Sequence, residues 1–242
     1  MGKIVIPAGK KMDEAKKTNR IRDAAFFETY LQGKVIDIGA GKDLVCPWAE
    51  RFDIEDGDAN RITQYRAPAS YDAVHSSHCL EHMTDPIAAL NQWWALIKPG
   101  GHLVLVVPDE DLYEQGYWPS RFNSDHKATF TTKTEKGWSP VSHNISELLA
   151  TLPDAELLHV EIQDQHYDHT LKASPSTPRP KTMGLGLRLA RKLVKAIPAL
   201  KTRYLRRIDD HLFRSHHIPI DQTAREALAQ IQVVAKKRQT VS

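Results

Sequence analysis

A short apolar run that ends in two closely spaced glycines is the first part of the sequence that could do chemistry. The stretch "VIDIGAGKDL", residues 35–44, places Asp37 beside Gly39 and Gly41, with Lys42 directly after them. Two glycines this close let a backbone bend tightly and approach a ligand that a Cβ atom would exclude. The stretch therefore predicts the floor of a nucleotide pocket but leaves the nucleotide open.

A second chemical signal is the adjacent carboxylate and imidazole of Asp125 and His126, in "NSDHKATF". A carboxylate can orient an imidazole so that it accepts a proton from a substrate. The alternative is that both side chains only order a loop through hydrogen bonds. The aromatic residues before the pair are either a stacking platform for a sugar ring or an ordinary edge of the core: Tyr113, Tyr117, Trp118 and Phe122.

Histidines at other positions offer a weaker signal for metal binding. His78 and His82 are four residues apart and would share one face of a helix. No third ligand of convincing spacing accompanies them, so His82 is interpreted as a structural residue and no metal is expected. The clusters "HYDH" (166–169) and "SHH" (215–217) are expected in loops, in contact with solvent or substrate.

These groups need elements that position them, and the first half of the chain predicts alternating strands and helices. Residues 10–31 have an apolar spacing that suits a helix, closed by Gly33. Short apolar runs at 34–38, 50–55, 71–77 and 102–108 are typical of buried parallel strands. Between the last two, "DPIAALNQWWALIKPGG" has helical spacing, with a proline near its start and Pro-Gly-Gly at its end.

The second half predicts one more helix, two more strands and an insertion. "ISELLATL" indicates a helix, and "ELLHVEIQ" and "AQIQVVAKK" (229–237) indicate strands. The Ser/Pro-rich stretch 172–181 begins an insertion that ends near Thr223. Strand, helix and strand in this order define a doubly wound α/β fold, in which ligands lie beyond the carboxyl ends of the strands. A dinucleotide enzyme would want a third glycine where this chain has Leu44.

Four stretches in order resemble a known family, the class I S-adenosylmethionine-dependent methyltransferases, in particular the methyltransferase type 11 group. They are "VIDIGAGK", "FDIEDGDAN", "YDAVHSSHCLEHMTDPIAALNQWWALIKPGG" and "HLVLVVPDE". The resemblance implies a Rossmann-like, doubly wound, seven-stranded sheet, mostly parallel with an antiparallel last strand, and a helical insertion before that strand. Lys42-Asp43 departs from the Thr-Gly common in the family. The short connection from Gly41 to Asp53 puts the first crossover helix in doubt.

The resemblance also implies a cofactor, S-adenosylmethionine, and the residues that hold it. Gly39 and Gly41 would let the loop approach its methionine part, and Asp37 would receive the ammonium group. Asp53 would accept hydrogen bonds from both ribose hydroxyls, and Asp58 with the Ala59 amide would read the adenine. The pocket would be closed after the strand at 71–77 by Ser76, Ser77 and His78.

Composition limits the class of protein. A chain of 242 residues with 41% hydrophobic content predicts a single domain over 1–242, with an N-terminal helical segment at 1–32. Two cysteines give no disulfide framework, the N-terminus has no signal-peptide pattern, and no stretch reaches the roughly 18 to 20 apolar residues of a membrane span. A cytoplasmic protein is therefore expected.

Charge is unevenly distributed along the chain. The formal charge of +3 does not indicate nucleic acid as a partner. Residues 185–208 contain eight cations and no acid, and their apolar positions predict an amphipathic helix kinked at Pro198. This basic part of the insertion 172–223 is either a solvated lid or a contact with an anionic surface or partner.

The sequence as a whole predicts methyl transfer from S-adenosylmethionine to a small-molecule or glycan acceptor, at oxygen. The stretch "RFNSDHKATFT" is also similar to methyltransferases encoded with glycan-assembly enzymes. In this interpretation His126 and Asp125 are the catalytic residues. Two alternatives stay open: an N- or carboxyl-methyltransferase on another metabolite, and a non-catalytic cofactor-binding partner in a glycan-assembly complex. The sequence does not indicate the oligomeric state.

Overall fold

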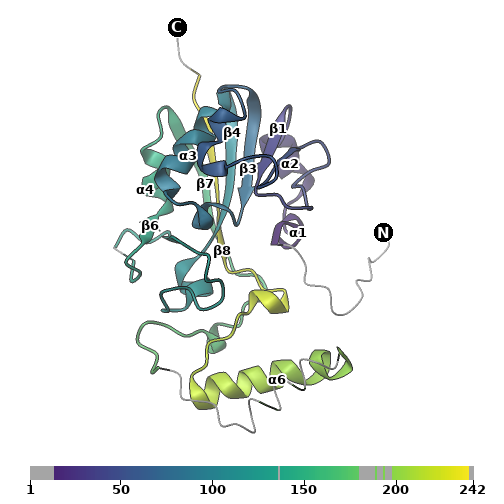
Figure 1. Ribbon diagram of the computed structural model, residues 1–242, viewed down its shortest axis with the longest axis vertical. Helices are drawn as coiled ribbons and strands as arrows, with labels where there is room; N and C mark the ends of the chain where they lie inside the picture. Colours follow the sequence, from purple (N-terminus) through teal and green to yellow (C-terminus); the bar gives the residue numbers. More distant parts are fainter. Residues whose placement is uncertain (1–13, 136, 180–188, 190–192, 194–197, 240–242) are drawn as a thin grey trace.

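A six-stranded sheet forms the centre of the molecule (Figure 1). The computed structural model describes residues 14–135, 137–179, 189, 193 and 198–239. The strands of the main sheet lie in the order β2-β1-β3-β4-β8-β7. They are β1 (Val35–Ile38), β2 (Glu50–Phe52), β3 (Tyr71–Ser77), β4 (Ile97–Pro108), β7 (Ala155–Gln163) and β8 (Gln230–Lys237).

Strand direction agrees with the predicted Rossmann-like arrangement. β2, β1, β3 and β4 are mutually parallel, and β8 runs antiparallel to both of its neighbours, β4 and β7. The predicted antiparallel last strand is therefore confirmed. Parallel strands end at one common edge, so the residues after β1, β2 and β3 are brought close together.

The predicted number of seven strands is wrong. Residues 53–70, between β2 and β3, contain only a short 3₁₀ helix, η1 (Ala59–Gln64), and no further strand. β2 is consequently the edge strand of the main sheet. The two remaining strands, β5 (Thr129–Thr131) and β6 (Ser142–Asn144), pair with each other in a separate small sheet.

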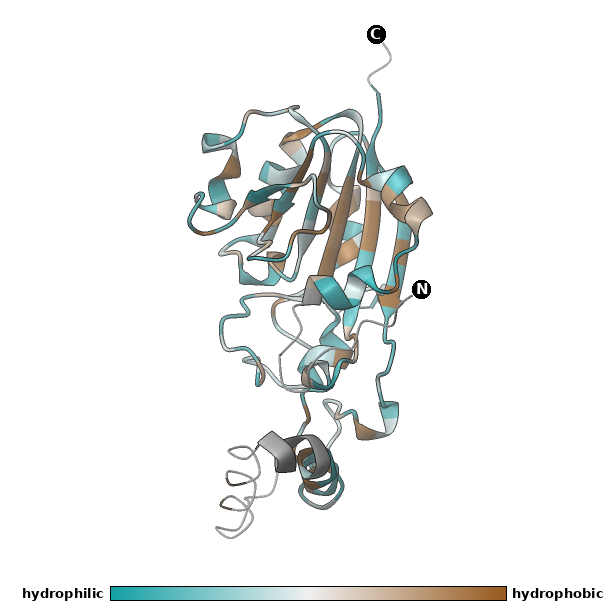
Figure 2. Cartoon of the chain, turned by 90° about the vertical axis from the view of Figure 1, so that its right-hand side faces the viewer, coloured by the Kyte–Doolittle hydropathy of each residue, from teal (hydrophilic) through white to brown (hydrophobic). Residues whose placement is uncertain are grey.

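The central strands bury nearly all of their side chains. From Leu103 to Val107 every residue of β4 is fully buried, as is expected of a strand covered on both faces. Figure 2 shows these strands as a hydrophobic layer inside the molecule. The covering helices are α2 (Ala24–Tyr30) on one face, and α3 (Pro86–Ala95) and α4 (Ile145–Ala150) on the other.

The helix α3 shows how local sequence signals set its ends and its orientation. Asp85 caps its first turn by accepting hydrogen bonds from the Ile87 and Ala88 amides at 3.0 Å, and Pro86 fits the first helical position. Trp93 and Trp94 are buried on its inner side, and each indole donates to a backbone carbonyl. The predicted helix is therefore present and fixed against both the η1 loop and the chain before β7.

The N-terminal segment differs from the single helix predicted for 10–31. It forms α1 (Glu14–Asn19) and α2, because Asp23 begins a new helix by accepting from the Phe26 amide at 2.8 Å. Residues 10–13 lie outside the described residues. The doubt about a crossover helix between Gly41 and Asp53 was justified, since turns connect β1 to β2.

The insertion ends in a long helix, α6 (Pro198–His216), which lies below the sheet in Figure 1. Pro198 is its first residue; the predicted helical positions before it, including Arg188, Arg191, Lys192 and Lys195, lie outside the described residues. Within α6, Arg206 and Arg207 are exposed, while Leu212 and Phe213 are buried. None of the helices in the described part of the chain has the length and apolar character needed to cross a bilayer.

Candidate active site

The glycine turn after β1 packs against the turn that follows β3. Gly39 has a φ of +75°, and a Cβ atom there would lie 2.7 Å from both Cβ and Sγ of Cys79. Gly41 also has a positive φ, and the nearest atom to its missing Cβ is Oδ2 of Asp53 at 3.9 Å. A side chain at position 39 would collide with the protein, whereas position 41 leaves an open backbone. The turn thus presents bare backbone beside a carboxylate.

Asp53 follows β2, and its half-buried carboxylate faces the glycine turn. Oδ2 accepts a hydrogen bond from the Gly41 amide, and Oδ1 accepts one from the Ile54 amide at 2.7 Å. The Asp56 carboxylate accepts from the Asp53 amide at 3.0 Å and from Arg51, which holds the turn in shape. A carboxylate oxygen can accept more than one hydrogen bond, so Asp53 keeps capacity for further donors.

Asp58 and Ala59 lie on the loop that continues from Asp53. Oδ1 of Asp58 accepts from the backbone and side-chain nitrogens of Asn60, and these hydrogen bonds hold the pKa of Asp58 below its ordinary value. The Ala59 carbonyl accepts from the Trp93 indole at 2.9 Å. Asp58 is exposed to solvent and Ala59 is half-buried, so this loop is anchored on one side and open on the other.

Asp37 lies deeper than the other predicted cofactor residues and is already engaged. Its Oδ1 lies 2.6 Å from Nδ1 of His75, and its Oδ2 accepts from the Val45 amide at 2.6 Å. Arg22 lies beyond His75, with Nη1 3.4 Å from Nε2. Burial lowers the pKa of Arg22 to about 10, although the negative charge of Asp37 acts in the opposite direction. Asp37 therefore holds the end of β1 and the following turn in place.

The end of β3 carries three of the predicted residues. Ser76 is buried and its hydroxyl donates to the Ile38 carbonyl at 3.0 Å, which ties β3 to β1. The buried hydroxyl oxygen of Ser77 has no hydrogen-bond partner among the described residues. His78 has a φ of +53°, and its Nε2 lies 2.9 Å from Oε1 of Gln230. The unpartnered buried hydroxyl of Ser77 and the open backbone at Gly41 both suit a bound cofactor at this edge.

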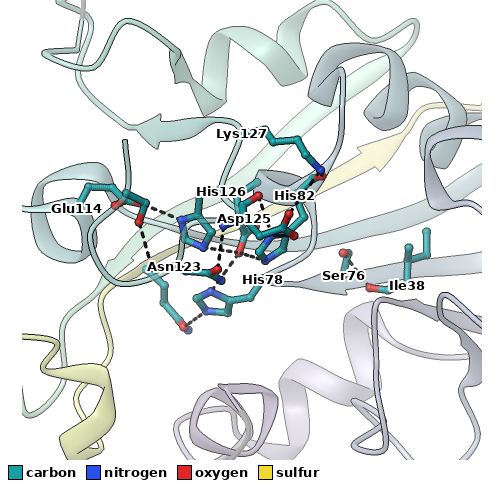
Figure 3. A network of polar contacts seen from close by, with 12 residues as sticks. Ile38, Ser76, His78, His82, Glu114, Asn123, Asp125, His126 and Lys127 are labelled. Carbon is teal, nitrogen blue, oxygen red and sulfur yellow. Dashed lines mark hydrogen bonds and ion pairs between the residues drawn. The ribbon is translucent and has the colours of Figure 1, made fainter. Parts of the chain in front are cut away.

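Beyond β3, the imidazoles of His78, His82 and His126 lie close to one another (Figure 3). They surround the buried carboxylate of Glu81. Glu81 is 1% exposed, and neither of its carboxylate oxygens has a hydrogen bond with the described residues. Oε1 of Glu81 lies 3.6 Å from His78, 3.9 Å from His82 and 4.0 Å from His126. Burial raises the pKa of Glu81, whereas the imidazoles, beginning with His78, lower it below its ordinary value when they are protonated.

The predicted pairing of Asp125 with His126 is corrected by the structure. His126 is buried, and its Nδ1 lies 2.6 Å from Oε1 of Glu114. Asp125 is 68% exposed at its side chain and pairs with His82, whose Nδ1 lies 3.0 Å from Oδ2. The chain turns at these residues, since the His126 amide donates to the Asn123 carbonyl at 3.2 Å, and the two neighbouring side chains reach different partners. Glu114, twelve residues earlier, is the carboxylate that orients His126.

Cys79 joins the two halves of the site. Its side chain packs against Gly39, where it would collide with any Cβ atom, and it precedes Glu81 by two residues. Burial raises the pKa of the Cys79 thiol to about 12, with smaller contributions from the negative charges of Glu81 and Asp53. The imidazole cluster therefore adjoins the glycine turn and Asp53.

Aromatic side chains cover one side of His126. Tyr113 stacks on the imidazole with ring centroids 5.1 Å apart, and Phe122 packs edge-on against Tyr113 at 5.8 Å. His82 meets His126 edge-on at 5.0 Å. Two of the four predicted aromatic residues thus border the imidazole cluster, whereas Tyr117 packs against a separate apolar cluster with Leu171 and Phe213.

The buried carboxylate of Asp109, just after β4, leads to a stability prediction. Asp109 caps the next helical turn, and burial raises its pKa to about 6. A pKa raised by folding means that the native state loses stability as pH rises from the unfolded value, about 3.9, through the folded one. The Asp109→Asn variant should therefore gain about 2 kcal/mol of unfolding free energy relative to the wild type between pH 4.5 and pH 7.5.

Urea unfolding of both proteins across this pH range measures the difference. Glu28→Gln removes an exposed carboxylate of α2 and serves as the control, whose difference from the wild type should stay nearly constant. An Asp109→Asn difference that does not change with pH would contradict the prediction.

Comparison with known proteins identifies the class to which this fold and site belong. Residues 10–139, more than half of the chain, match a family model described as a methyltransferase domain. The chain belongs to this methyltransferase family. It is an enzyme that uses S-adenosylmethionine as its methyl donor. No curated protein sequence matches it.

Solved structures resemble the chain at low sequence identity. A methyltransferase from Archaeoglobus fulgidus has 15% identity and a TM-score of 0.47, over 93% of this chain and 95% of that one. A methyltransferase from Thermotoga maritima has 12% identity and a TM-score of 0.46, over 93% and 88% of the two chains. At these scores the likeness adds nothing about the acceptor, and the assignment rests on the family match.

Two residues of the site were missed from the sequence. Glu81 is the centre of the imidazole cluster, and Glu114 is the partner of His126. The adjacent Glu81 and His82, four and five residues after the predicted strand 71–77, were a local signal for Glu81. Nothing local marks Glu114, because its contact with His126 depends on how the chain after β4 turns back.

Proposed function

We propose that the enzyme methylates a hydroxyl group of a small molecule or glycan. When bound, S-adenosylmethionine supplies a methyl group on a positively charged sulfur. An amine acceptor needs only to be neutral, whereas a hydroxyl is a poor nucleophile at neutral pH and needs activation. The observation that supports a hydroxyl acceptor is the buried imidazole of His126, which Glu114 orients.

In this proposal, the residues around the glycine turn hold the cofactor. Asp53 accepts the ribose hydroxyls, and Gly41 offers its backbone to the methionine part. Asp58 and Ala59 contact the adenine, while Ser77 and His78 close the pocket after β3. The partial engagement of Asp37 by His75 and Val45 supports a less direct role, in which its remaining capacity contacts the ammonium through water.

His126 is the group proposed to activate the acceptor. Glu114 holds Nδ1, and Nε2 lies 4.0 Å from Oε1 of Glu81. In this proposal Nε2 draws the proton from the hydroxyl while the oxygen gains the methyl group. Asp125 contacts His82 and would influence His126 only indirectly, through the His82 ring. The stacked ring of Tyr113 supports a flat acceptor such as a sugar, because aromatic faces pack well against sugar rings.

The acceptor type can be tested with isotope-labelled S-adenosylmethionine and three panels of acceptors that carry hydroxyl, amine or carboxyl groups. We expect label in the hydroxyl panel, with sugars the most active, and mass spectrometry should find one added methyl group per product. Cell-envelope glycans compared with and without the protein extend the test to large acceptors. Transfer only to amines or carboxyl groups would overturn the proposal, as would the absence of turnover by a protein that binds the cofactor.

A further inference from the structure

The imidazole cluster gathers its nitrogens around Glu81 from two separate segments. His78 and His82 come from the turn after β3, and His126 from the chain before β5 (Figure 3). The chain also fixes these segments to each other, since the Lys127 amide donates to the Glu81 carbonyl at 2.7 Å. One ligand atom each from Glu81, His82 and His126 lies within 4.8 Å of the others.

The outward nitrogens of two of these imidazoles are held by carboxylates. Nδ1 of His126 lies 2.6 Å from Glu114, and Nδ1 of His82 lies 3.0 Å from Asp125. A carboxylate accepts hydrogen bonds, so each Nδ1 carries a proton and donates it. In a neutral imidazole the other nitrogen, Nε2, then has no proton and offers a lone pair. Both of these lone pairs face Glu81.

His78 is arranged in the same way with its nitrogens exchanged. Its Nε2 lies 2.9 Å from Oε1 of Gln230. The amide of Gln230 cannot be turned around, because its Nε2 donates to Oε1 of Gln163 at 2.7 Å and to Thr18 at 2.8 Å. Nε2 of His78 is therefore the donor, and its Nδ1 faces Glu81 at 3.6 Å.

Lone pairs that converge on a buried carboxylate repel it unless positive charge lies between them. A buried carboxylate without hydrogen bonds costs several kcal/mol unless a cation compensates it. Extra protons on the imidazoles or a bound metal ion would each supply that charge. The orientation of metal-ligating histidines by carboxylates on their far nitrogens is a common feature of metal sites, and it is present here twice.

We propose that Glu81, His82 and His126 bind one divalent transition-metal ion, next to His78. Two imidazoles and a carboxylate are the donor set that Zn²⁺ and its neighbours in the periodic table prefer. Donors around Zn²⁺ lie about 3.4 Å apart. The distances from Glu81 to His82 and His126, 3.9 and 4.0 Å, would have to close by about half an ångström. The two imidazoles, whose ligand atoms lie within 4.8 Å of each other, would also have to move closer together.

This inference rests on the proposed function for its role, though not for the binding itself. Three protein ligands leave a coordination position open, which the acceptor oxygen would take. Coordination lowers the pKa of a hydroxyl, so its proton leaves to solvent water. The methyl group then moves from sulfur to oxygen, the new C–O bond forms, and sulfur keeps the electron pair of the broken bond. In this arrangement the ion takes over the activation that the proposed function assigns to the free His126 imidazole, because Nε2 of His126 would bind the ion instead of the proton.

Metal binding can be measured without any acceptor. Metal-free full-length protein is titrated with Zn²⁺, Mn²⁺ or Mg²⁺ alone, and bound metal is counted after dialysis. We expect one tight equivalent of Zn²⁺ or Mn²⁺, weaker binding of Mg²⁺, and a rise in Tm upon binding. Co²⁺ should give visible absorption bands typical of mixed nitrogen and oxygen ligands.

Three variants measure how much individual residues contribute to metal binding. Glu81→Gln keeps the shape of the side chain and should abolish the tight equivalent and the Co²⁺ bands. Glu114→Gln changes only the group behind His126 and should weaken binding about 10- to 100-fold. His169→Ala removes a half-exposed histidine that pairs with Asp164 on the surface, and should leave the tight equivalent intact. Tm without metal shows whether each variant is folded.

The outcomes separate this inference from the proposed function. A Glu81→Gln protein that is folded and binds the metal as the wild type does would overturn the inference, as would a wild type with no tight equivalent. The cluster would then be an internally protonated network, and transfer to a hydroxyl could still occur in metal-free protein. Conversely, tight metal binding together with transfer only to amines would support the metal site and refute the proposal that the acceptor is a hydroxyl group.

Discussion

Replacing His126 with alanine should lower turnover by about 100-fold or more while changing the affinity for S-adenosylmethionine by less than about twofold. The imidazole acts on the acceptor oxygen, directly or through a bound ion. The cofactor is expected to be held by the glycine turn and Asp53, on the other side of Cys79. The loss should therefore be seen in kcat, not in cofactor binding.

Initial rates with an identified hydroxyl acceptor and calorimetric titration of the cofactor measure the two quantities. His159→Ala is the matched control, since His159 is a half-exposed residue of the edge strand β7. Wild-type turnover in His126→Ala, or a loss that follows weakened cofactor binding, would remove His126 from the reaction. His78 and Asp109 would then be the next candidates.

Of the two carboxylates that contact the cluster, Glu114 should matter more for turnover than Asp125, although Asp125 is the neighbour of His126 in the sequence. Glu114 is buried and lies 2.6 Å from His126, whereas Asp125 is exposed and contacts His82. The Glu114→Gln variant should therefore lose more turnover than Asp125→Asn, and both should lose less than His126→Ala. A larger loss in Asp125→Asn would favour the sequence neighbour as the positioning residue.

The fold was predictable wherever a local pattern decides the structure. The buried runs at β1, β3 and β4 and the Asp-Pro start of α3 are local signals, and the structure has an element at each of them. However, α3 ends at Ala95, and β4 begins at Ile97 and includes the Pro-Gly-Gly stretch that was predicted to end the helix. The number of strands was not local information. It came from the family resemblance, and residues 53–70 are too few and too polar to form another helix and strand. The break between α1 and α2 was missed because Asp23 was counted within one helical pattern instead of as a cap.

The site divides in the same way. A glycine turn and the acid after the next strand can be recognised from residues near one another in the chain, and Asp53 does face Gly41. The proposed metal ligands cannot be recognised from neighbouring residues. His126 reaches Glu81 only after the chain passes through α3, β4 and the η3 turn (Glu110–Glu114). Spacing along the sequence therefore revealed His78 and His82 but not the residues that complete their surroundings.

Replacing Asp53 with alanine should weaken binding of both S-adenosylmethionine and its demethylated product by about 100-fold or more. The ribose is common to both ligands, and a hydrogen bond to a charged acceptor contributes about 1.5 to 3 kcal/mol. Alanine would leave two hydroxyls without acceptors at the half-buried end of β2. The Asp53→Asn variant keeps one acceptor oxygen, so its loss should be smaller, about tenfold.

Titration calorimetry with each ligand gives the affinities. Glu55→Gln, two residues away in the same turn, is the matched control. It removes one negative charge, yet its side chain is 68% exposed and pairs with Arg51. Asp53 also accepts from the Gly41 amide, so the Tm of each variant must be measured to separate a loosened turn from a lost ligand contact. Wild-type affinity in a folded Asp53→Ala protein, or tighter binding of a nicotinamide dinucleotide than of S-adenosylmethionine, would refute the assignment of this carboxylate to the ribose.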